Sequence, residues 1–125
     1  MKYDEVSERL LNEMPEFQPG ESDPDSPYIT AGRFAHFLLE MYRQENMDAL
    51  SRGLSFIERL YESDDRQVRE LAVIGYLEGL QNVWSNRGTD PESIFPLLGE
   101  NSRQWWIELN EFWSGRTKYV GQSQR

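Results

Sequence analysis

The chain has no cysteine and a single histidine, His36. The absence of cysteine excludes disulfide bonds, thiolate metal sites and a cysteine nucleophile, and it favours a reducing compartment such as the cytoplasm. Long apolar runs are also missing, because no stretch approaches the roughly 20 apolar residues that a membrane-spanning helix needs. The first residues lack the basic and then apolar pattern of a signal peptide. Together these absences predict a soluble, cytoplasmic protein.

Basic residues are outnumbered by acidic ones. Thirteen Lys and Arg stand against 22 Asp and Glu, which leaves a net charge of −9. Such a surface would repel phosphate backbones, so direct binding to nucleic acid is disfavoured. Residues 1–30 alone hold eight acids and two bases, and this segment carries two-thirds of the excess charge. The asymmetry is compatible with a basic protein partner, and solubility alone is the other explanation.

The 125 residues suit one domain, and a hydrophobic content of 38% is enough to form a core. Apolar side chains recur at intervals of three and four, and no convincing β-alternation occurs. We therefore predict an all-α protein, a compact bundle of five to six helices. The expected helices span residues 3–14, 28–44, 47–62, 65–85, 91–98 and 102–114. The single domain is predicted to span 1–115, with an acidic, proline-rich loop at 15–27 and a flexible polar tail at 116–125.

The segment 65–85 is the longest and least polar of the expected helices, which predicts a central position. Gly75 and Gly79 lie on one of its faces, and we expect another helix or an aromatic ring to approach the backbone closely there. Ser63 or Asp64 is placed to cap this helix, because a short polar side chain accepts hydrogen bonds from the free backbone N–H groups. Ser102 is the expected cap of the last helix.

The run from Leu60 to Ala72 resembles the hinge of a HEAT repeat. In such a hinge a short acidic turn precedes a helix that opens with a Val-Arg pair, here Val68 and Arg69. The resemblance covers one repeat, roughly 35–40 residues. It implies an antiparallel pair of helices folded back on one another. No second copy occurs at a fixed period, so only the hairpin geometry is expected.

A wider resemblance spans residues 28–115. It depends on Phe34–Glu40, on Leu77–Asn82 with Asn86–Gly88, and on Trp105–Trp106 with Phe112–Gly115. In these strings the chain resembles a small uncharacterised bacterial all-helical family, some members of which have immunity roles in toxin systems. The resemblance implies a helical fold and a role in toxin immunity.

Residue types suited to catalysis are few. His36 would have to be the base of a Ser-His-Asp triad, but it lies among apolar residues of a helix, which favours a partly buried structural role. Glu58 and Glu62 suit a general acid and base in a pocket, yet their spacing equally describes an exposed polar stripe. Asp23 and Asp25 alternate as in a calcium loop but lack its central glycine and distal glutamate. We predict no enzyme activity, no cofactor and no metal site.

The preferred hypothesis is an immunity or antitoxin protein that binds and neutralises a cognate basic toxin domain, for example a nuclease, in the producing cell. An acidic surface speeds encounter with a positively charged groove. The alternative is a helical protein-interaction adaptor or scaffold without an inhibitory role, and the oligomeric state stays open. The candidate partner-binding residues are six acids and one tryptophan that we expect to be partly exposed: Glu16, Glu21, Asp23, Asp25, Asp64, Asp65 and Trp106.

Overall fold

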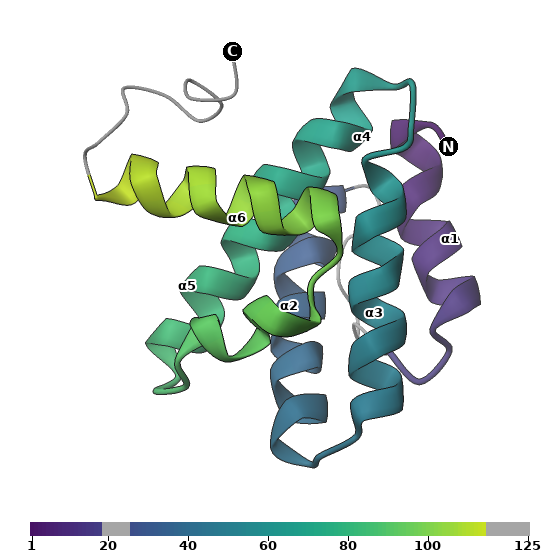
Figure 1. Cartoon of the computed structure of the whole chain (residues 1–125). Helices are drawn as coiled ribbons and strands as arrows, with labels where there is room; N and C mark the ends of the chain where they lie inside the picture. The colour runs from purple at the N-terminus through teal and green to yellow at the C-terminus, as the bar shows by residue number, and fades with distance from the viewer. Residues whose placement is uncertain (19–25, 115–125) are drawn as a thin grey trace.

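The computed structural model describes residues 1–18 and 26–114, and these residues fold into helices and their connections (Figure 1). The chain opens with a 3-10 turn, η1 (Tyr3–Glu5), which leads into α1 (Val6–Glu13). The elements that follow are α2 (Pro27–Arg43), α3 (Met47–Leu60), α4 (Arg66–Glu70), η2 (Leu71–Leu77), α5 (Glu78–Asn86), η3 (Pro91–Leu97) and α6 (Glu100–Trp113). The predicted all-α fold is confirmed, and the described ranges contain no strand.

Short polar side chains start two of the longer helical runs. The side chain of Asn46 accepts a hydrogen bond at the start of α3. Asp65 caps α4, with its Oδ1 atom 3.0 Å from the backbone nitrogen of Gln67. The predicted cap, Ser63 or Asp64, is therefore wrong by one or two positions, because the turn after α3 is longer than the apolar spacing indicates.

The predicted central helix is confirmed as a continuous helical run, α4–η2–α5, that packs along α2 (Figure 1). A Cβ atom added at Gly75 would lie 3.3 Å from the Cβ of Ala31 in α2. One added at Gly79 would lie 3.8 Å from the Cβ of Ala35. The predicted close approach is thus confirmed at Gly75, whereas a Cβ atom at Gly79 would make an ordinary van der Waals contact.

The middle of this run, η2, is a π-helix, in which backbone hydrogen bonds reach one residue further than in an α-helix. Six of its seven residues are buried, and Ile74 is the exposed one. The π-helix contacts α2, α3 and α6, so nearly all of its side chains meet neighbouring helices. Apolar spacing predicted an ordinary helix here, because one or two turns of α- and π-helix bury similar patterns.

Helix α6 crosses the central run and projects beyond it at its C-terminal end (Figure 1). Trp106 is fully buried, and its indole N–H donates to Glu92 of η3 at 2.8 Å. The expectation that Trp106 is partly exposed is therefore wrong, because the ring lies in the core and Glu92 of η3 accepts from its indole N–H. Trp113 is the exposed tryptophan, at 57%. Capping by Ser102 is wrong too, since the N-cap of α6 is Gly99, three positions earlier.

The turn after α3 reverses the direction of the chain, so α3 and the central run form a helical hairpin (Figure 1). The likeness of this hairpin to a HEAT repeat stays a prediction. Most of the predicted acidic loop, residues 19–25, and the predicted flexible tail, 116–125, lie outside the described residues.

Candidate functional site

The N-terminal segment and the turn after α3 are hydrogen-bonded to each other at one end of the molecule. The backbone N–H of Tyr3 donates to Asp65 Oδ2 at 2.9 Å, and Ser63 Oγ donates to the carbonyl oxygen of Met1 at 2.6 Å. Asp65 also accepts from the backbone N–H of Gln67. This predicted partner-binding residue therefore holds two backbone segments together, and its side chain is half-buried.

The same contacts bring three acids from distant parts of the sequence to this end. Asp4 follows Tyr3, and Glu62 and Asp64 lie in the turn that Tyr3 contacts. All three side chains are exposed, and none belongs to an ion pair formed within residues 1–18 and 26–114. We call Asp4, Glu62 and Asp64 the acidic end. Of these three acids, sequence reasoning named only Asp64 for partner binding, because Asp4 reaches this end through the tertiary contact between Tyr3 and Asp65.

Glu16, another predicted partner-binding acid, is paired within the molecule. Its carboxylate accepts hydrogen bonds from Arg52 of α3, which also pairs with Asp48 at 2.9 Å. Further along the same two segments, Glu13 of α1 pairs with Arg59 of α3. The hydrogen bond from Arg52 lowers the pKa of Glu16. We call these five residues the α1–α3 seam, because their ion pairs join the N-terminal segment to α3.

The remaining predicted site residues fall into two groups. Glu21, Asp23 and Asp25 lie outside the described residues. Trp106 lies in the core and is not accessible to a partner. Of the acids predicted from the sequence, Asp64 is therefore the one that the structure describes as exposed and outside any ion pair of the described residues.

Glu58 caps the N-terminus of α6. Its carboxylate accepts hydrogen bonds from the backbone N–H groups of Asn101 and Ser102, both at 3.0 Å. The side chains of the same two residues donate to it at 3.1 and 2.8 Å. The first turn of a helix leaves N–H groups without internal partners, and Gly99 at the N-cap has no side chain to accept from them. Glu58 satisfies two of these groups from a different helix.

This capping role sets the charge state of Glu58. Burial alone raises its pKa, but the hydrogen bonds from Asn101 and Ser102 outweigh burial and leave the pKa lowered. A general acid working near neutral pH needs a raised pKa. Glu62 lies exposed in the turn after α3. The two glutamates therefore do not form the acid–base pocket that was one interpretation of their spacing.

Metal-binding clusters and membrane-spanning helices are both absent from the part of the chain that the structure describes. No three His, Asp or Glu side chains of residues 1–18 and 26–114 are grouped so that they could hold a metal ion. No described helix is long and apolar enough to cross a membrane.

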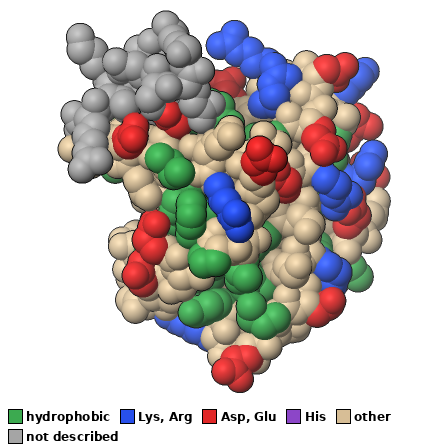
Figure 2. Space-filling model, viewed as in Figure 1, with side chains coloured by type: hydrophobic (Ala, Val, Ile, Leu, Met, Phe, Trp, Pro, Cys, Tyr) green, Lys and Arg blue, Asp and Glu red, His purple; other side chains and the backbone are tan. Residues whose placement is uncertain are grey.

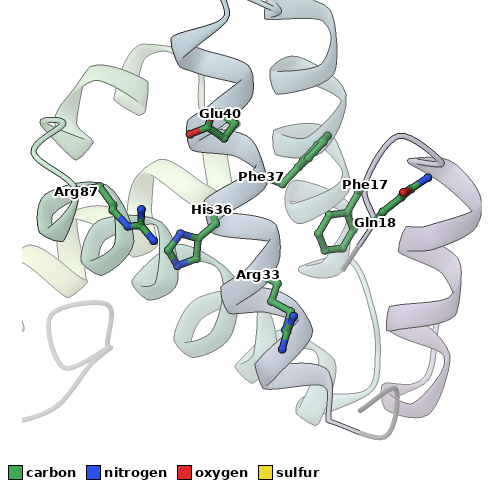
Figure 3. Close-up of a pocket in the computed structure, with 7 residues that line it drawn as sticks. All are labelled: Phe17, Gln18, Arg33, His36, Phe37, Glu40 and Arg87. Carbon is green, nitrogen blue, oxygen red and sulfur yellow. The ribbon is translucent and has the colours of Figure 1, made fainter. Parts of the chain in front are cut away.

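One open pocket of about 410 Å³ lies over the exposed side of α2 (Figure 3). His36 of α2 and Arg87, which follows α5, point toward one another on one side of the helix, while Phe17 and Phe37 lie on the other. The two phenyl rings are 5.4 Å apart between centroids. His36 is exposed, so the expectation of a partly buried histidine is wrong. The pocket is a shallow surface that spans two sides of a helix.

Apolar side chains gather over α6 and η3 on the face shown in Figure 2. Leu97 is 45% exposed, Ile107 47% and Trp113 57%. The guanidinium of Arg103 lies 5.9 Å from the ring centroid of Phe95, where it covers part of η3. Large exposed apolar groups are typical anchors in protein interfaces. The sequence prediction expected a partly exposed tryptophan in the last helix but assigned this role to Trp106, whereas the exposed ring is Trp113.

Comparison with known proteins identifies the family. The model of a domain of unknown function, DUF7674, matches residues 7–114, and the chain belongs to this family. No curated protein and no solved structure matches the chain.

Proposed function

We propose that this protein works by stoichiometric binding to a basic protein, as an immunity or antitoxin protein that neutralises a cognate basic toxin domain, for example a nuclease. The observation that carries the proposal is the acidic end. Three exposed acids from two distant segments lie there outside any ion pair of the described residues, on a chain whose net charge is −9.

The physical mechanism has two steps. Exposed carboxylates attract a positively charged partner over a distance of about 8–10 Å at physiological salt and so raise the rate of encounter. Apolar anchors that become desolvated in the complex then slow its dissociation. Ile107 and Trp113 have the exposure that such anchors require. The carboxylates set the association rate and the anchors set the lifetime.

No catalytic step is part of the proposal. The best-defined pair of acids considered from the sequence, Glu58 and Glu62, is divided between a helix cap and an exposed turn. A protein adaptor or scaffold without an inhibitory role is the second candidate. The apolar face over α6 and η3 favours it, because that face offers a binding surface that does not depend on charge.

The test is co-expression in a bacterial host with the polypeptide encoded by the open reading frame adjacent to this gene. The proposal expects that polypeptide to stop growth alone, and co-expression to restore growth and to yield a one-to-one complex on gel filtration. Absence of toxicity, or toxicity that this protein does not relieve, would contradict it. A complex without any effect on growth would favour the adaptor.

A further inference from the structure

A second pocket, of about 500 Å³, lies between the central run and α6. We call it the α4–α6 pocket. Its apolar lining comes from Val73 and Ile74 of the π-helix η2, from Tyr61 after α3, and from Trp105 of α6. Val73 is 5% exposed and Ile74 is 41% exposed, so the lining runs from the core to the surface. Ligand pockets in proteins commonly have volumes of about 300–1,000 Å³ and a mainly apolar lining.

The polar lining of the α4–α6 pocket is rich in hydrogen-bond donors. The side chain of Arg66 makes no hydrogen bond or ion pair with the described residues, and Arg69 donates from Nη1 to the carbonyl oxygen of Ser63 at 2.7 Å. The indole N–H of Trp105 has no acceptor among the described residues either. Glu70 is the one carboxylate in the described lining. The pocket thus has an excess of donors and of positive charge on an otherwise acidic protein.

The local backbone supports a binding role. π-helical turns are rare, and those that occur are frequently found at functional sites. In this chain the α4 segment supplies Arg66 and Arg69, and the π-helix that follows directly supplies Val73 and Ile74. The change of helix type therefore falls where the cationic part of the pocket meets its apolar part.

We propose that the α4–α6 pocket binds an organic carboxylate that carries an aromatic or branched aliphatic group. The planar guanidinium group matches a carboxylate with two parallel hydrogen bonds, and Arg66 retains all of its donors for this purpose. The apolar group of the ligand contacts Val73, Ile74 and Trp105. A free small acid and the C-terminal residue of a peptide share this chemistry. The inference is independent of the proposed toxin binding, because it concerns ligands of the opposite charge.

The test is a nuclear magnetic resonance titration of the full chain, labelled with ¹⁵N, at low ionic strength. The probes are N-acetylphenylalanine, its uncharged amide, and 3-phenylpropionate. The indole N–H resonance of Trp105 is assigned by its loss in Trp105→Phe. We expect both acids to shift this resonance and the amide to leave it unchanged. Tighter binding of N-acetylphenylalanine identifies a peptide C-terminus as the natural source, and tighter binding of 3-phenylpropionate identifies a free acid.

Two variants separate the pocket from a general attraction of anions. Arg66→Gln removes a guanidinium group that forms no hydrogen bond or ion pair with another described residue, so the fold is preserved. We expect the affinity for both acids to fall roughly tenfold. Arg87→Gln removes the same charge from the open pocket over α2 and leaves the affinity unchanged. Equal weakening by the two variants, an equal response to the amide, or no shift of Trp105 at millimolar acid would each overturn the proposal.

Discussion

The α1–α3 seam and the acidic end both contain exposed carboxylates, yet they use them in opposite ways. In the seam, Glu13 and Glu16 meet Arg59 and Arg52, so most of the local charge is balanced inside the molecule. At the acidic end, no described base pairs with Asp4 or any other member. Net charge therefore does not tell which acids can attract a partner. Their placement against the basic residues of α3 decides it.

The carboxylate of Glu58 is engaged by hydrogen bonds within the molecule, and its removal has the largest expected effect on stability. Glu58→Ala leaves the N–H groups of Asn101 and Ser102 without their acceptor. We expect the free energy of unfolding to fall by roughly 2–4 kcal/mol, as for a half-buried cap that accepts several hydrogen bonds. Glu62→Ala at the acidic end is the control, with an expected change within about 0.5 kcal/mol. Urea denaturation of both variants measures the difference, and equal losses would show that Glu58 does not close α6.

The pH dependence of stability tests the capping role of Glu58 further. The pKa of Glu58 is lowered in the folded protein, so its contribution is complete above the unfolded pKa of about 4.3 and is lost as the pH falls through the lower folded value. We therefore expect the difference in stability between the wild type and Glu58→Gln to be constant above about pH 5.5 and to shrink below about pH 4.5. The measurement is thermal unfolding at a series of pH values. A difference that grows on acidification contradicts the capping role.

Neutralising one acid of the seam and one acid of the acidic end is expected to have different effects on the stability of the fold. Glu16→Gln removes the partner of Arg52 and lowers stability slightly, and the loss disappears in about 1 M salt, where exposed ion pairs are screened. Asp64→Asn removes an acid that has no ion-pair partner among the described residues and leaves stability unchanged or slightly higher. Melting temperatures at low and high salt check both expectations. A loss in Asp64→Asn as large as in Glu16→Gln would remove the distinction between the two regions.

Sequence reasoning predicted the helical fold well because apolar spacing is a local property. The same pattern predicted the central position of the run through Gly75 and Gly79. This prediction is correct because small residues of α2 face the two glycines. The π-helix could not be predicted in this way. Its hydrogen-bond register depends on the neighbours that surround η2 in the folded chain.

The candidate site was less predictable because its parts are far apart in the sequence. Glu58 accepts from residues that lie more than 40 positions away, so its capping role leaves no local signal. The sequence prediction named Trp106 as the partly exposed ring, whereas the exposed tryptophan is Trp113. The position of η3 decided between them, because Glu92 of that segment accepts from Trp106.

The acidic end is proposed to attract the basic partner, and the rate of association with that partner tests this proposal most directly. The measurement is stopped-flow binding to the purified toxin domain encoded beside this gene, with Asp64→Lys compared with Glu45→Lys. Glu45 is an exposed acid in the loop between α2 and α3, at the opposite end of the bundle (Figure 1), and the two variants have the same net charge. We predict that Asp64→Lys slows association about threefold or more at low salt and weakens its salt dependence, whereas Glu45→Lys has a smaller effect. Equal rates for the two variants would contradict the account.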